Sequence, residues 1–200
     1  MVKPTLRNGL VLVGDVVILA GGRLAHEAVK GAGYAKPTPM EFIESVVEFK
    51  GGVRPELARQ AHDLFVAGKW TQLETLFKQN NLNGGWPPNR GAIATREVEL
   101  PANAKFDRYG GYIDPKTGKF KDSGAFVARE DVPFPKRALP ESYSDPKVKP
   151  KTTYRVLKPI KGVKEGEAVP WFGQPGKGTQ YELPAGVDDL IDGGFIEKIN

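Results

Sequence analysis

The chain changes character at the polar, glycine-bearing stretch 79–85, and this change constrains the fold more than any other feature. Before it, apolar residues recur at helical spacing. Thr38-Pro39-Met40-Glu41 supplies the capping threonine, first-position proline and glutamate of a helix start. After it, three segments have strand composition: 94–100, 154–157 and 179–183. The pattern predicts an α+β protein, with a helical region 1–80 and a small β-rich domain 81–200 that carries long ordered loops.

The apolar stripes of the helical region predict how it packs. Three helices are expected, beginning at Pro39, at Pro55 and near Trp70. Their stripes are too apolar to stay in water, so the helices should pack as a unit against the β-rich part. The side chains expected at this contact are Phe42, Val46, Leu64, Phe65, Leu73 and Phe77. A short helix is expected at 187–191 and a last strand at 195–199.

The apolar run 9–22 is a separate case. It is shorter than the roughly 20 apolar residues needed to span a bilayer, and Asp15 interrupts it. We interpret it as a buried helix, with the remnant of a translocation segment as the alternative. No stable membrane insertion is expected.

The run from Trp171 to Gln180 combines two aromatic residues, three glycines and an amide at the start of a predicted strand. Glycines let a backbone turn sharply and approach a ligand closely. The aromatic rings supply a stacking face, and the Gln180 amide supplies a neutral hydrogen-bonding group. A plain hairpin connection can have the same composition. The local pattern therefore indicates a binding loop without identifying the ligand.

Composition excludes several kinds of site. The chain has no cysteine and only two histidines, His26 and His62, so neither a disulfide framework nor a thiolate zinc site is available. The net charge is +5, from 29 basic and 24 acidic residues, which suits an anionic ligand or an acidic partner. The densest basic run, 147–151, is broken by Pro150 and lacks aromatics, as in a solvated loop. We expect neither nucleic-acid binding nor a metal ion.

Several motifs occur in a fixed order between about residues 80 and 199. They are Gly85-Trp86-Pro87-Pro88-Asn89-Arg90-Gly91-Ala92, Asp107-Arg108-Tyr109-Gly110, Gly118-Lys119-Phe120, Arg137-Ala138-Leu139-Pro140, Tyr154-Arg155-Val156 and the glycine loop ending at Gln180. This series resembles the TNT domain, named after the tuberculosis necrotizing toxin, a family of NAD+ glycohydrolases. The resemblance implies a hydrolase that splits NAD+ into nicotinamide and ADP-ribose. NAD+ would be the substrate, and no cofactor is expected.

The resemblance also implies roles for single residues. Arg137 and Gln180 match the family's catalytic positions, with Arg137 holding the diphosphate at the surface of a cleft and Gln180 contacting the reacting ribose. Taken alone, Arg137 reads as a surface salt bridge and Gln180 as a solvent-facing strand residue. Phe120 and Phe126 are the candidates to sandwich the nicotinamide ring, although core packing explains Phe126 equally well. The remaining substrate-binding candidates are Arg108, which could instead pair with Asp107, together with Tyr109, Trp171 and Gln174.

The family also implies a biological setting. Its members often form the C-terminal part of larger secreted or contact-delivered proteins, as in competition between bacteria. An effector of this kind would deplete NAD+ in the target-cell cytoplasm, and its producer would need a cognate immunity protein. This chain departs from some members, which carry a histidine after the Arg-Ala-Leu-Pro element. A histidine-dependent step is therefore not expected here.

Two rival functions stay open. An ADP-ribosyltransferase would use the same NAD+ and commonly depends on a glutamate beside the ribose. Glu182 lies two residues past Gln180 and would share its strand face. A non-enzymatic binding module could instead use the aromatic loops as its recognition surface.

Overall fold

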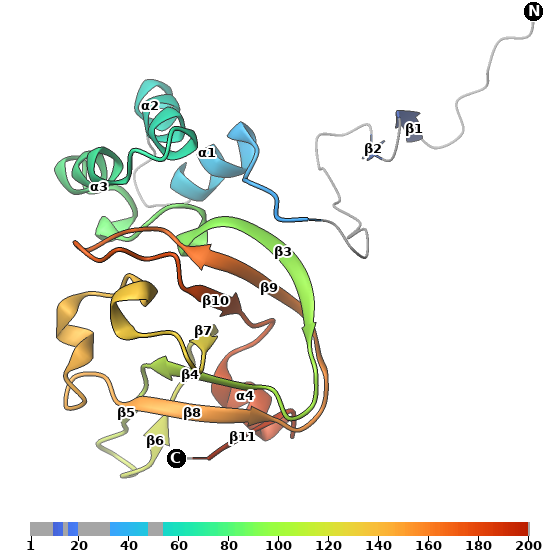
Figure 1. The fold of residues 1–200 in the computed structure, drawn as a ribbon, viewed down its shortest axis with the longest axis vertical. Coiled ribbons are helices and arrows are strands. Elements are labelled where there is room, and N and C mark those ends of the chain that lie inside the picture. The colour runs from blue at the N-terminus through green and yellow to red at the C-terminus, as the bar shows by residue number, and fades with distance from the viewer. Residues whose placement is uncertain (1–9, 14–15, 20–32, 48–53, 200) are drawn as a thin grey trace, which may run out of the picture. The chain divides into compact units, whose positions relative to one another are not determined.

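The structure, a computed structural model, describes residues 10–13, 16–19, 33–47 and 54–199. The chain divides into two units, residues 1–32 and residues 33–200. The second unit contains both the helices and the main sheet (Figure 1). A division into a helical region and a catalytic domain near residue 80 stays a prediction. No helix in the described ranges is both long and apolar enough to cross a membrane.

The described residues of the first unit form two strands, so the buried helix predicted over 9–22 is wrong. Strands β1 (Leu10–Val13) and β2 (Val16–Leu19) pair antiparallel, with Val13 opposite Val16. Five of the eight residues in the two strands are β-branched, which favours extended backbone. The sequence between them is Gly14-Asp15, a dipeptide typical of two-residue hairpin connections. That signal was present in the sequence and should have outweighed the apolar run.

The second unit begins with three helices: α1 (Pro39–Val47), α2 (Pro55–Val66) and α3 (Trp70–Gln79). The predicted helix start at Thr38 is confirmed. The Thr38 backbone N–H donates to Glu41 Oε2 at 2.7 Å, and the Glu41 N–H donates to Thr38 Oγ1 at 3.3 Å. This reciprocal box satisfies N–H groups that a helix start otherwise leaves unpaired. On α2, His62 packs its ring against Phe42 with centroids 5.3 Å apart, whereas His26 lies outside the described residues.

The helices pack on the rest of the second unit through their apolar faces. Phe42, Phe65, Leu73 and Phe77 are fully buried, as predicted, and Leu64 is partly buried. The Val46 side chain lies outside the described part of the molecule. The helical residues share one cluster with Ala138, Ala168, Val169 and Trp171. Full burial of each large side chain contributes roughly 1.5–3 kcal/mol. The helices therefore belong to the same core as the segments around residues 138 and 170.

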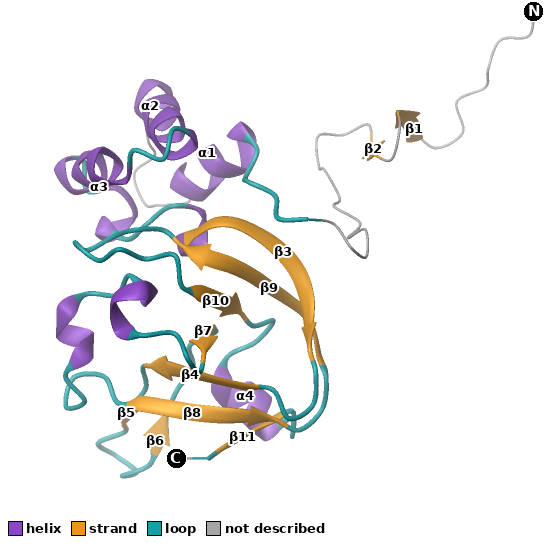
Figure 2. Ribbon diagram, viewed as in Figure 1, coloured by secondary structure: helices purple, strands orange, loops and turns teal. Residues whose placement is uncertain are grey.

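Seven antiparallel strands form the main sheet, in the order β11-β8-β4-β7-β10-β9-β3 (Figure 2). Their bounds are β3 (Ala92–Leu100), β4 (Lys105–Tyr109), β7 (Phe126–Arg129), β8 (Lys151–Val156), β9 (Ile160–Ala168), β10 (Thr179–Glu182) and β11 (Ile196–Lys198). A small separate pair joins β5 (Tyr112–Ile113) to β6 (Phe120–Lys121). The predicted α+β class is confirmed, as are the strands near 94–100, 154–157, 179–183 and 195–199.

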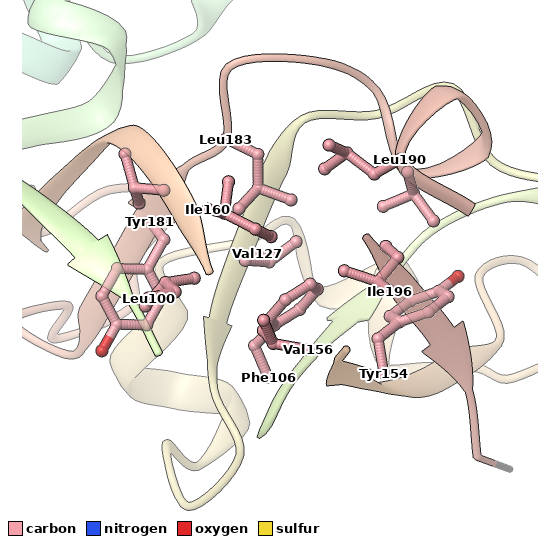
Figure 3. Packing of buried hydrophobic residues seen from close by; sticks show 12 residues of the cluster. Leu100, Phe106, Val127, Tyr154, Val156, Ile160, Tyr181, Leu183, Leu190 and Ile196 are labelled. Carbon is pink, nitrogen blue, oxygen red and sulfur yellow. The ribbon is translucent and has the colours of Figure 1, made fainter. Parts of the chain in front are cut away.

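One face of this sheet carries a second apolar core, covered by α4 (Val187–Asp192) (Figure 3). Phe106, Tyr154 and Tyr181 point into it from three strands, and Leu190 meets them from α4. Side chains alternate between the two faces of a strand. The residues that flank these core positions therefore lie on the opposite face, and that face carries most of the candidate site.

Candidate active site

A row of paired residues crosses the sheet on the face opposite the apolar core. The register places Asp107 of β4 opposite both Thr153 and Ala128, and Ala128 opposite Gln180 of β10. Residues paired across strands have side chains on the same face. Asp107 and Gln180 therefore share this face, with only β7 between their strands. At the usual spacing of neighbouring strands, their backbones lie on the order of 10 Å apart.

Arg137 is tied to this row through Asp107. It ends the short 3-10 helix η3 (Phe134–Arg137), and its Nη1 forms an ion pair with Asp107 Oδ1. Its Nε and Nη2 both donate to the Val132 carbonyl oxygen, at 2.8 and 2.6 Å. Its guanidinium carbon also lies 5.0 Å from the centre of the Tyr109 ring. These contacts fix the plane of the guanidinium.

Burial corrects the prediction that Arg137 lies at the surface of a cleft. Its side chain is only 4% exposed, and that of Asp107 is 0% exposed. The second Asp107 oxygen pairs with Lys151 Nζ at 3.0 Å, and Lys151 is 43% exposed. Buried charges of this kind are stable only when paired and hydrogen-bonded. Arg137 thus holds the structure of the site, and three of its five N–H groups already face protein acceptors.

Gln180 lies on the same face, next to the turn before β3. Its Nε2 donates a long hydrogen bond of 3.4 Å to the Arg90 carbonyl oxygen, and its side chain is half-buried. The glycine loop that precedes it is anchored to the segment that carries Arg137. Gly178 N–H donates to the Lys136 carbonyl oxygen at 2.8 Å, and Gly176 N–H donates to that of Pro135 at 3.2 Å. The glycine loop therefore packs on η3 (yellow in Figure 1), the 3-10 helix that ends at Arg137.

The two predicted stacking rings are placed differently. Phe126 lies on the face of Gln180, directly opposite Glu182, and is 42% exposed, so part of its ring is open to solvent. The Phe120 ring, on β6, lies 4.5 Å from Lys198 Nζ. Lys198 is paired with Tyr154 and thus shares the face of the apolar core. The described contacts do not bring Phe120 next to Phe126, so a sandwich by both rings stays a prediction.

Arg108 pairs with Asp122 and not with Asp107. Its Nε lies 2.9 Å from Asp122 Oδ2, and its Nη1 donates to the Phe126 carbonyl oxygen at 3.1 Å. Burial raises the pKa of Asp122, and the Arg108 charge opposes that rise. These contacts make Arg108 a structural support of the strand that bears Phe126. Tyr109 instead lies on the site face, with its ring 5.1 Å from that of Phe134.

Trp171 and Gln174 hold the glycine loop in place. Trp171 is 1% exposed, donates from Nε1 to the Gly85 carbonyl oxygen at 2.7 Å, and packs edge-on against Phe77. It therefore offers no open ring face for stacking. Gln174 Nε2 donates to Glu141 Oε2 at 2.7 Å, and Glu141 begins the 3-10 helix η4 (Glu141–Ser144). Both residues act on the loop, and contact with substrate remains a prediction for each.

Sequence reasoning missed two partners in this site. Asp107 stands in the quoted Asp-Arg-Tyr-Gly element, but its partner Arg137 comes from the distant 3-10 helix η3, so no local pattern predicts the pair. Arg90 stands in the quoted Pro-Pro-Asn-Arg-Gly element and contacts Gln180, Phe126 and Glu182. The available signal was its position, an arginine between asparagine and glycine in a turn before a strand.

The glycine loop yields a stability prediction at Gly176. Its φ is +60°, and a Cβ there would lie 2.7 Å from the Ala168 carbonyl oxygen. Gly176→Ala should therefore lower the free energy of unfolding by about 2 kcal/mol or more, measured by urea denaturation. Gly173→Ala is the matched control, since its φ is +73° but nothing lies within 4 Å of the added Cβ. Equal losses of unfolding free energy in the two variants would show that the close contact with the Ala168 carbonyl oxygen does not add to the cost.

Comparison with known proteins identifies the family of the chain. A sequence model described as tuberculosis necrotizing toxin matches residues 99–199. The chain belongs to this tuberculosis necrotizing toxin family.

Similar proteins include a fungal glycohydrolase and a bacterial toxin of known structure. The conidial surface nicotinamide adenine dinucleotide glycohydrolase nadA of Aspergillus fumigatus is 31% identical over 126 residues, covering 58% of this chain and 49% of that protein. The chain thus spans about half the length of this curated relative. The structure of tuberculosis necrotizing toxin complexed with its immunity factor is similar with a TM-score of 0.43 and 22% identity. The match covers 56% of this chain and 60% of that one.

Proposed function

We propose that the chain is an NAD+ glycohydrolase that hydrolyses the bond between nicotinamide and ribose. Family membership carries this proposal, together with one structural observation: Gln180 and the Arg137–Asp107 pair share a face of the sheet with the exposed ring of Phe126. The similarity to a nicotinamide adenine dinucleotide glycohydrolase supports the same substrate. Residues 81–200 would hold the reacting groups, and the helices before them would support the glycine loop.

The chemistry suits a site without an obvious general acid. The C1′–N1 bond breaks with both electrons leaving on nicotinamide, which is already a cationic pyridinium and needs no proton. Water adds to the oxocarbenium-like ribose and loses a proton to solvent. Gln180 would contact the ribose, and Phe126 would attract the cationic ring by up to ~2 kcal/mol when desolvated. Orientation and contacts strengthened in the transition state would supply most of the rate.

Burial of Arg137 refines its proposed role. A guanidinium fixed by Asp107 and Val132 has two N–H groups without an acceptor among the described contacts, and these would be the ones to donate to a diphosphate. Half-exposed Lys151 adds a second cation beside it. We propose that the pair attracts the diphosphate, with Arg137 mainly positioning Asp107, Lys151 and Tyr109.

ADP-ribosyl transfer is the second candidate, because Glu182 shares the face of Gln180. Its carboxylate forms an ion pair with Arg90, so its negative charge is already balanced. Transfer requires a macromolecular acceptor, whereas hydrolysis requires only water. This difference allows one assay to separate the two.

Incubating the purified chain with NAD+ alone tests the proposal. We expect nicotinamide and free ADP-ribose to appear in equal amounts and in many turnovers per protein molecule, measured by chromatography. Nicotinamide release only when a cell extract is added, with label transferred to protein, would support the transferase. Tight binding to a partner without any NAD+ turnover would support a binding module.

The biological setting is a separate proposal. We propose that the chain is a toxin domain delivered as part of a secreted or contact-delivered protein, used in competition between bacteria and acting in the cytoplasm of the target cell. The family description as a necrotizing toxin supports this, as does the surface location in the name of the fungal relative. A producer of such a domain would need an immunity protein, and the net charge of +5 favours an acidic one.

A further inference from the structure

Arg90 connects three side chains of the site face that the proposed mechanism does not otherwise link. Its Nη2 forms an ion pair with Glu182 Oε1, and its guanidinium carbon lies 5.4 Å from the centre of the Phe126 ring. Its carbonyl oxygen accepts the hydrogen bond from Gln180 Nε2. One residue from the turn before β3 therefore contacts the amide, the carboxylate and the ring on two other strands.

The backbone at Arg90 is strained in a way that maintains these contacts. Asn89 and Arg90 have φ values of +51° and +52°, in the left-handed region that non-glycine residues rarely adopt. The turn is held by Asn89 Nδ2, which donates to the Ala92 carbonyl oxygen at 2.6 Å, and by the Gly91 N–H, which donates to that of Pro88 at 3.0 Å. Two consecutive strained residues persist only where surrounding contacts fix them, commonly at functional sites.

Glu182 is placed to meet a ligand beside Gln180. The two residues are two positions apart on β10, so their side chains leave the same face about 7 Å apart. The Glu182 side chain is 18% exposed, and only Oε1 takes part in its ion pair. Among the described contacts, none engages Oε2. A carboxylate held by one oxygen with the other open accepts hydrogen bonds from hydroxyl groups.

We propose that Glu182 accepts a hydrogen bond from a hydroxyl of the nicotinamide ribose, with Arg90 as the positioning residue that aims its carboxylate. This inference rests on the proposed NAD+ glycohydrolase activity. The ribose would lie between the Gln180 amide and the Glu182 carboxylate, next to the Phe126 ring. The negative charge would also favour the positive charge that develops on the ribose in the transition state.

The test compares Glu182→Gln with the wild type on NAD+ and on analogues that lack either the 2′- or the 3′-hydroxyl of the nicotinamide ribose. Hydrogen bonds to charged groups are worth enough to predict a 10- to 100-fold loss of kcat/KM in Glu182→Gln on NAD+. One of the two analogues should cost the wild type a similar factor. That analogue should cost Glu182→Gln clearly less than it costs the wild type, since the strong hydrogen bond to a charged carboxylate has become a weaker one to a neutral amide oxygen.

The test of Arg90 must separate a role in positioning Glu182 from a general role in stability. Arg90→Ala should lower kcat/KM on NAD+, and it should add little in the Glu182→Gln background. The urea midpoint of each variant identifies any loss that comes from unfolding. Glu197→Gln is the matched control, because it removes the same charge from the Arg155–Glu197 pair on β11, with three strands between it and β10. It should keep full activity.

The outcomes separate this inference from the proposed function. No turnover of NAD+ by the wild type would overturn both. Turnover by the wild type with unchanged kcat/KM in Glu182→Gln would overturn only the role of Glu182. The role of Glu182 would also be overturned if each analogue lowered kcat/KM by the same factor in Glu182→Gln as in the wild type. Neither hydroxyl would then contact this carboxylate.

Discussion

Replacing Arg137 with alanine is expected to lower the free energy of unfolding by about 3–5 kcal/mol and to remove NAD+ cleavage. Among the described residues, the change would leave the fully buried Asp107 carboxylate with Lys151 as its remaining ionic partner, and it would free the Val132 carbonyl oxygen. Removing one partner of a buried ion pair has a cost of this size. Urea denaturation measures the first effect, and turnover measured below the unfolding midpoint gives the second.

Two comparisons sharpen this result. Arg129→Ala removes an exposed arginine that pairs with Asp131, and its midpoint should hardly change. Arg137→Lys keeps a charge but loses the planar guanidinium that reaches both Asp107 and Val132. Its free energy of unfolding should therefore lie between those of the wild type and Arg137→Ala. A folded Arg137→Ala variant with the wild-type midpoint would show that the buried pair does not hold the site.

Gln180→Ala should leave the fold intact and slow NAD+ hydrolysis at least ~100-fold. Within the described residues its side chain makes one hydrogen bond, which is long at 3.4 Å, so little stability depends on it. Loss of a positioned donor to the transition state commonly lowers kcat on this scale. The measurement is kcat at saturating NAD+, together with NAD+ affinity by calorimetry. We expect the affinity to change less than kcat.

Gln60→Ala provides the control, because it makes the same substitution at an exposed position of α2. It should match the wild type in both assays. Full activity in Gln180→Ala would contradict the catalytic role of the amide while leaving family membership untouched. The ribose would then require a different contact on the same face.

Local sequence signals predicted the elements that depend on local physics. The capping box at Thr38, the helical stripes and several strands follow from neighbours in the chain, and the structure has them. Strand β9 was not predicted, because charged residues and two glycines interrupt its apolar positions and its buried residues are irregularly spaced. The prediction of a helix over 9–22 is wrong because a continuous apolar run fits a helix and a pair of strands equally well.

The sequence predicted which residues belong to the candidate site better than it predicted their burial and contacts. Motif resemblance located Arg137, Gln180 and Phe126, and the structure places Gln180 and Phe126 on one face with Arg137 beside Asp107. Sequence could not show that Arg137 and Trp171 are buried, because burial depends on segments far apart in the chain. The Asp107–Arg137 and Arg90–Glu182 pairs likewise form where short 3-10 turns pack against strands that are distant in the chain, which no local pattern fixes.

The contact between Trp171 and Phe77 limits how such a domain can be exchanged between proteins. The glycine loop rests on the helices at one side and on the segment before Arg137 at the other. The family match begins at residue 99, yet part of the buried cluster around the loop comes from residues 42–82. Recombination that moved only the matched region to a new carrier would separate the loop from its support. We therefore expect a transferable unit that folds to include the helical layer as well as the matched region.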